Sequence, residues 1–204
     1  MGFSDGVADY LPEGFAAITE QWTEGLDITI KASNPRRSIM GSCRKRGSHF
    51  AVTVNNDLNP YSFLLVLTHE LAHVKTFHQY GIRQVPHGKA WKTTYRLMLL
   101  QLLETDLFPE ALGKAIRRYA SSPQSSILLD NMLTRALSIY DNTECTDTFF
   151  LEDLPLATLF SIGNRVFSRG VRVRTRYKCR DMGNGRYYLI NGVARVQTIP
   201  SAKQ

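Results

Sequence analysis

Residues 59–81 read NPYSFLLVLTHELAHVKTFHQYG, and this stretch predicts one long helix. Asn59 is a favourable N-cap, and Pro60 suits the first helical position, where a missing N–H group costs nothing. Apolar residues then recur at helical spacing, and Gly81 can end the helix in the left-handed conformation. The helix should therefore have roughly twenty residues, a length of about 30 Å, and it should be mostly buried.

The centre of this helix carries the sequence His69-Glu70-Leu71-Ala72-His73. Residues four apart share one face of a helix, so both histidines can bind one metal ion. Glu70 follows the first histidine directly, which places its carboxylate beside the metal as a base for metal-bound water. The motif predicts a zinc hydrolase site with His69 and His73 as ligands and Glu70 as the catalytic residue.

A catalytic zinc ion usually has three protein ligands, so one must come from outside the motif. His78 lies nine residues after His69, about half a turn away from the ligand face of the helix. His87 is the better candidate, because the Gly- and Pro-containing connection before it lets the chain turn back and a second helix follows. Glu104 and Asp106 are the alternatives, and either would make a site of two histidines and one carboxylate.

The stretch from Asn55 to Trp91, with NNDLNPYSFLLVLTHELAH followed by VPHGKAW, resembles the SprT-like family of zinc metallopeptidase domains. In that family a short H-E-x-x-H helix is followed by a histidine in an HGxxW or HGxxF element. The resemblance implies that His69, His73 and His87 bind the zinc ion. It also assigns the role of base to Glu70. The family includes proteases that degrade proteins crosslinked to DNA.

The rest of the chain predicts an α+β fold. Strands are expected over 26–30, 36–43 and 49–54, and helices over 10–24, 87–102, 109–119 and 130–140. With the resemblance, these elements imply a compact zincin-like catalytic domain in which a small sheet packs on the H-E-x-x-H helix. From Leu154 onward, alternating residues and Asn-Gly turns predict a small antiparallel β module of four to five strands.

Three parts of the chain are expected from these patterns. They are a SprT-like domain at 1–120, a helical linker region at 121–153, and a basic β-rich C-terminal module at 154–204. The serines around Pro123 are the signal for the linker.

The net charge of +7 is concentrated in the C-terminal module. Residues 161–204 hold ten Lys and Arg against one acid, whereas residues 104–160 hold four against nine. A cation stands at every second position of one segment: Arg172, Arg174, Arg176, Lys178 and Arg180. A single strand would place all five on one face, about 6.6 Å apart, comparable to the phosphate spacing along a nucleic acid. DNA or another polyanion is therefore the predicted partner.

The C-terminal module departs from the family pattern in its cysteines. Many SprT-like proteins carry a C-terminal zinc ribbon with paired C-x-x-C elements. Here Cys179 stands at the first position of such an element, but Met182 occupies the place of the second cysteine. One Zn²⁺ per chain is therefore expected, and the C-terminal module should fold without metal.

Membrane association is not expected from the sequence. No stretch approaches about 18 apolar residues, and the N-terminus has no apolar signal segment. A cytoplasmic location is therefore the default expectation.

Two functions are consistent with the sequence. The first is a zinc-dependent metalloendopeptidase acting on a protein or peptide substrate, including proteins bound to nucleic acid. Oxyanion stabilisation is then a candidate role for Tyr95, Arg83 or Lys89. The second is a nucleic-acid-binding protein with a mainly structural zinc site, which four protein ligands would favour. Glu70 favours the first function, because a structural site has no use for a base.

Overall fold

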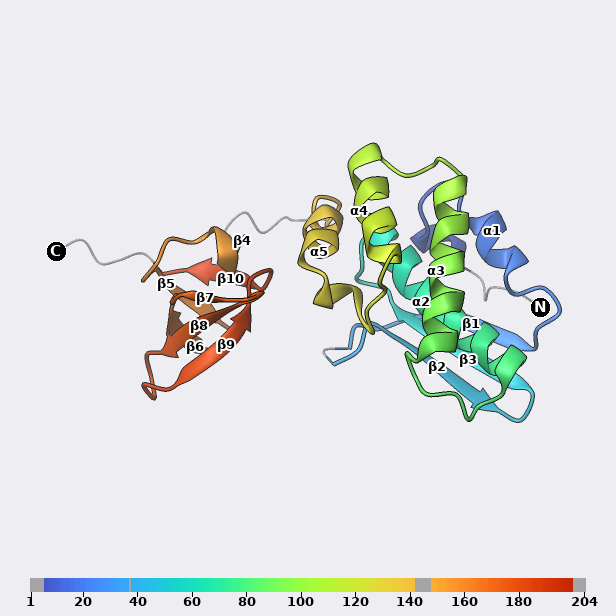
Figure 1. Cartoon of the computed structure of the whole chain (residues 1–204), viewed down its shortest axis with the longest axis horizontal. Coiled ribbons are helices and arrows are strands. Elements are labelled where there is room, and N and C mark those ends of the chain that lie inside the picture. Colours follow the sequence, from blue (N-terminus) through green and yellow to red (C-terminus); the bar gives the residue numbers. More distant parts are fainter. Residues whose placement is uncertain (1–5, 37, 142–147, 200–204) are drawn as a thin grey trace. The chain divides into compact units, whose positions relative to one another are not determined.

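Figure 1 shows the computed structural model of the chain, which describes residues 6–36, 38–141 and 148–199. The contacts between residues divide the chain into two compact units, Met1–Asp141 and Asn142–Gln204. The first unit combines helices with a small sheet, and the second is built from antiparallel strands. The predicted α+β class is therefore confirmed.

The first unit contains most of the helices. They are η1 (Ala8–Tyr10), α1 (Ala16–Gln21), α2 (Pro60–Tyr80), α3 (Lys89–Glu104), α4 (Glu110–Ala120), η2 (Ile127–Leu129) and α5 (Asn131–Ser138). Its strands are β1 (Ile28–Ser33), β2 (Gly41–Arg46) and β3 (His49–Asn55). Strand β3 lies between the other two, parallel to β1 and antiparallel to β2.

Helix α2 begins and ends where the sequence predicts. The Asn59 side chain accepts a hydrogen bond from the Ser62 N–H group at 2.8 Å. Gly81 ends the helix with φ of 79°, and its N–H group donates to the Phe77 carbonyl at 3.0 Å. The helix contacts β2 and β3 on one side and α3 on another, so apolar residues around its circumference are buried.

Two predicted elements are shorter in the structure. The helix expected over 10–24 is confined to α1, since Gly14 has φ of 84° and interrupts it. The strand expected over 36–43 begins only at β2. Before it, Asn55 Nδ2 donates to the carbonyl groups of Arg36 and Ile39, at 3.1 and 3.0 Å, and holds these residues in a loop.

The segment after α4 packs into the first unit. Ile127, Leu133 and Leu137 are buried in the same core as α2 and α3. The region 121–153, expected as a helical linker, is thus divided at Asp141 between the two compact units.

The second unit contains one seven-stranded sheet. Its strands are β4 (Thr148–Phe150), β5 (Leu159–Ile162), β6 (Arg165–Ser168), β7 (Arg172–Val173), β8 (Arg176–Asp181), β9 (Tyr187–Asn191) and β10 (Arg195–Thr198). A short 3₁₀ helix, η3 (Leu151–Asp153), follows β4. Four to five strands were expected, and the number rises because β4 precedes Leu154 and the arginine-rich segment folds into two strands.

A separate apolar core supports this sheet. It is formed by Leu151, Leu154, Phe160, Phe167, Tyr177, Cys179 and Val196. Among the described residues of both units, every helix is too short or too polar to span a membrane.

Candidate metal centre and cationic surface

Three histidine side chains meet beside α2. The Nε2 atom of His87 lies 3.1 Å from Nε2 of His69 and 3.1 Å from Nε2 of His73. Ligands about 2.0–2.1 Å from one tetrahedral zinc ion would be about 3.3 Å apart, so this spacing suits a shared ion. In the described part of the chain, these three residues are the one group of His, Cys, Asp or Glu side chains that could hold a metal.

The protonation of the histidines also suits a metal. Burial, with a smaller contribution from the neighbouring histidines, lowers the pKa of His69 to about 3 and that of His73 to about 4. Burial also lowers the pKa of His87, and Lys92 adds to this effect. Because the neutral imidazole is the form that binds a metal ion, all three side chains are ready to bind at neutral pH.

The local backbone explains the HGxxW element. His87 has φ of 57°, a left-handed conformation that turns its ring toward α2. A Cβ atom on Gly88 would lie 2.9 Å from the Val85 carbonyl oxygen, so only glycine fits there. The Trp91 ring then packs against the rings of His69 and His87, each with centroids 4.6 Å away. Glycine permits the close turn, and tryptophan supports the histidine rings.

The alternative ligands lie elsewhere. Glu104 is exposed at the last residue of α3, about 22 Å along the helix from its first residue. Asp106 is also exposed and follows the end of that helix. His78 is exposed on α2, outside the histidine group.

Glu70 lies next to the histidines on the buried side of α2. Burial raises the pKa of Glu70 to about 7, and the positive charge of Arg36 acts in the opposite direction. Strand β2 approaches this carboxylate closely, since a Cβ atom on Gly41 would lie 2.7 Å from Glu70 Oε1. A glycine at the start of β2 therefore leaves room for the carboxylate.

The histidines and Glu70 line one cleft of about 560 Å³. Residues 38–43, which lead into β2 and form its first half, also line it. Further lining comes from Phe77 and Pro86 near the ends of the α2–α3 connection, and from residues 125–128 between α4 and α5. The cleft therefore combines a metal-binding group, a buried carboxylate and apolar surface.

Sequence reasoning missed Arg36, which also lines the cleft. Its Nε donates to Asn55 Oδ1 at 2.9 Å, and its Nη1 donates to Ser42 Oγ at 3.4 Å. Its Nη2 is buried without a hydrogen-bond partner among the described residues. Arginine side chains are mostly exposed in proteins, so the sequence contains no signal for this position.

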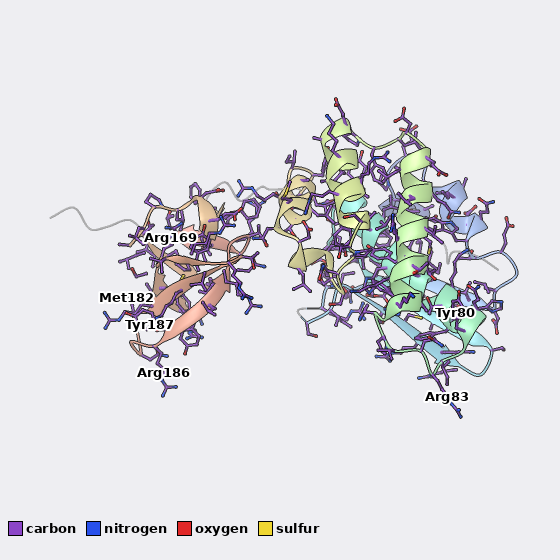
Figure 2. The ribbon with its side chains drawn as sticks, viewed as in Figure 1. Tyr80, Arg83, Arg169, Met182, Arg186 and Tyr187 are labelled. Atoms are coloured by element: carbon purple, nitrogen blue, oxygen red, sulfur yellow. The ribbon has the colours of Figure 1, made fainter. Side chains whose placement is uncertain are left out.

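None of the residues suggested for oxyanion stabilisation lines the cleft. The Tyr95 ring is fully buried, and its hydroxyl group donates to the Leu65 carbonyl at 3.3 Å. Arg83 projects outward from the surface (Figure 2). Lys89 is exposed at the start of α3.

The sheet, the central helix and the histidine group together define a metalloprotease-like domain that could hold a metal ion. Residues 12–105 match the SprT-like family. The resemblance inferred from the H-E-x-x-H and HGxxW elements is confirmed. Comparisons with curated proteins and with solved structures find no match to the chain. Residues 106–141 and the second unit lie outside the matched range.

In the second unit, the prediction of one strand with five aligned cations is wrong. Arg172 lies in β7, Arg174 has φ of 58° in a tight turn, and β8 begins at Arg176. Arg172 pairs with Tyr177 across the hairpin, and directly opposed residues of an antiparallel pair share a face. Since Tyr177 points into the core, Arg172 does not share the outer face of β8.

The outer face of β8 retains three cations, Arg176, Lys178 and Arg180, whose side chains are exposed. Register with β9 places Leu189 opposite Lys178 and Tyr187 opposite Arg180. The Tyr187 side chain is 61% exposed, and Lys178 Nζ lies 4.7 Å from the centre of its ring. Figure 2 shows Tyr187 at the surface of this unit. These five residues are called the β8–β9 face.

Acids do not offset the charge of the β8–β9 face. Asp181 is the one acid among residues 161–204, and it is buried on the opposite side of β8. Its carboxylate accepts a hydrogen bond from Arg165 Nε at 2.9 Å. Within the described residues, the three cations of the face form no ion pair with an acid.

Proposed function

We propose that the first unit is a zinc-dependent endopeptidase in which His69, His73 and His87 hold the metal and Glu70 is the base. The observation that carries this proposal is the convergence of three histidine Nε2 atoms beside a buried carboxylate in one open cleft. In the described part of the chain no fourth acidic, cysteine or histidine side chain joins the group. Structural zinc sites usually have four protein ligands, so three favour a catalytic site.

Each residue of the site has a defined task in peptide hydrolysis. Zinc, when bound, supplies Lewis-acid stabilisation of the negative charge that develops on the scissile carbonyl oxygen. Glu70 accepts a proton from the attacking water and delivers it to the leaving amine nitrogen. A base is most effective when its pKa lies near the working pH, and burial of Glu70 moves its pKa in that direction.

The edge of the sheet supports an extended substrate. Strand β2 is an outer strand of the three-stranded sheet, and its first residues line the cleft. Edge strands bind extended peptides through main-chain hydrogen bonds. A protein segment lying along β2 would bring its backbone carbonyl groups past Glu70 and the histidines.

Metal removal tests this function. We expect a chelator to abolish cleavage of an unfolded protein substrate and added Zn²⁺ to restore it. His69→Ala and His73→Ala should lose both bound zinc and cleavage. His78→Ala is the matched control, because His78 lies on the same helix outside the histidine group and should retain both. Cleavage that persists in the metal-free protein or in His69→Ala would exclude the proposal.

We further propose that the β8–β9 face binds nucleic acid, which would direct the peptidase to proteins bound there. The face combines an exposed tyrosine ring with three cations that form no ion pair with an acid among the described residues. Cations contact phosphates, and aromatic rings stack on the bases of single strands. This combination favours a single-stranded nucleic acid over other polyanions.

Charge replacement on this face tests the second proposal. We expect Arg176→Gln, Lys178→Gln and Arg180→Gln together to weaken binding of a single-stranded oligonucleotide at least tenfold. The slope of log affinity against log salt should fall by about 2, since each lost phosphate contact changes it by about 0.7. The control replaces Arg172, Arg174 and Arg186 by Gln, which removes equal charge from outside the face. Equal weakening by both triple variants would show that only net charge matters.

A further inference from the structure

The connection between α4 and α5, residues 121–130, forms one wall of the cleft. The proposed peptide hydrolysis does not itself require this wall. Residues 125–128 line the same cleft as His69 and Glu70. In Figure 1 this yellow connection extends from α4 toward the blue segment that precedes β2. It lies outside residues 12–105, the range that matches the SprT-like family.

This wall is held firmly by its own contacts. Ile127 is buried in the core of the first unit, and its carbonyl accepts a hydrogen bond from Thr134 Oγ1 at 3.1 Å. The Tyr119 hydroxyl group donates to the Gln124 carbonyl at 3.0 Å. Ser126 Oγ accepts from the Leu128 N–H group at 3.3 Å. Because both sides of η2 are tied to α4 and α5, its backbone has a defined position.

Leu128 is the apolar side chain that this wall presents to the cleft. It is 49% exposed, whereas its neighbour Ile127 is buried. Ile39 and Phe77 add further apolar surface to the cleft. A substrate side chain that covers Leu128 would remove this apolar surface from water, which favours binding of an apolar residue.

We propose that Leu128 determines substrate specificity by contacting a large apolar side chain of the substrate close to the scissile bond. The inference rests on the proposed peptidase function, since it names the substrate preference of the same cleft. One apolar contact of this kind discriminates between side chains by about tenfold or more. The preference then depends on a residue beyond the family-matched range.

Leu129 provides a matched control for the test. It lies next to Leu128 in the same 3₁₀ helix and is 52% exposed, but it does not line the cleft. Replacing either leucine by glutamate adds the same charge at nearly equal exposure. Leu128→Ala serves as a second variant, because it removes the contact without adding a charge.

The first measurement is the cleavage profile of a peptide library on the zinc-loaded full chain. We expect the unchanged protein to favour a large apolar residue at one position beside the cleaved bond. Leu128→Glu should lose at least tenfold in this preference and gain cleavage before or after Lys or Arg at the same position. Leu129→Glu should retain the original profile. A profile that is unchanged in Leu128→Glu and Leu128→Ala overturns the inference and leaves the peptidase function intact.

The second measurement is binding of peptide hydroxamates to the same proteins by calorimetry, which needs no turnover. The unchanged protein should bind a leucine-bearing hydroxamate about tenfold more tightly than a lysine-bearing one, and Leu128→Glu should reverse the order. This reversal without any cleavage would refute the peptidase function while supporting the role of Leu128. Equal selectivity in the two glutamate variants would refute the role of Leu128.

Discussion

Glu70→Gln is expected to reduce peptide-bond hydrolysis by a factor on the order of 10²–10⁴ while zinc content stays unchanged. Glutamine has nearly the shape of glutamate but cannot accept the proton of the attacking water. The proposed ligands are the three histidines, so the change leaves the candidate metal-binding group intact. The measurement is kcat/KM on a protein substrate, with zinc content determined on the same samples.

Glu104→Gln is the control for this prediction, because Glu104 is exposed at the end of α3 and far along that helix from the site. It should retain both hydrolysis and zinc. Hydrolysis by Glu70→Gln at a rate close to that of the unchanged protein would remove Glu70 from the mechanism.

In the metal-free protein, Glu70→Gln should increase the free energy of unfolding at alkaline pH. Burial raises the pKa of Glu70 from its ordinary value of 4.5 to about 7. The stabilising contribution of a group with a raised pKa is fully present below pH 4.5 and is lost as pH rises through 7. At pH 8, Glu70→Gln should therefore be more stable than the unchanged protein, by about 3 kcal/mol. Near pH 4 the two should be equally stable.

Urea denaturation of the chelator-treated proteins across this pH range provides the measurement. The buried histidines are present in both proteins, so their own titration cancels in the difference. Adding Zn²⁺ should shrink the difference at pH 8, because a nearby divalent cation stabilises the carboxylate. A difference that does not change with pH would contradict the burial of an ionisable Glu70.

Helix α2 could be predicted from the sequence because its determinants are local. Asn59 and Gly81 define its ends through contacts within one turn. His69 and His73 share a face because they are four residues apart. The sequence favours His87 over Glu104 and Asp106 as the third ligand, because the connection before it lets the chain turn back, but it leaves both carboxylates as alternatives. The family resemblance also favours His87. In the structure its Nε2 atom lies 3.1 Å from the Nε2 atoms of both motif histidines.

The hairpin of β7 and β8 could not be predicted because its turn lacks the usual residues. Arg174 takes the left-handed conformation that Gly, Asn or Asp normally occupies in such turns. The alternation of cations continues through the turn, so the sequence has the appearance of a single strand. Pairing with β9 then decides that Arg176, Lys178 and Arg180 share a face with Tyr187.

The packing of the serine-rich segment after α4 also could not be predicted from the sequence. Its composition is typical of a linker, yet Pro123 and Ile127 are buried and Leu128 lines the cleft. Burial of these residues depends on contacts with elements distant in the sequence. Composition carries no information about such contacts.

By itself, the sequence determined the central helix, its two motif histidines, the glutamate between them and the resemblance of this segment to the SprT-like family. Helical spacing and capping are properties of neighbouring residues, so they can be derived without the fold. Only the tertiary structure decided the meeting of His87 with the other histidines, the position of Arg36 in the cleft, and the exposure of Leu128 to it. These features arise where distant segments pack together, and packing depends on the whole core.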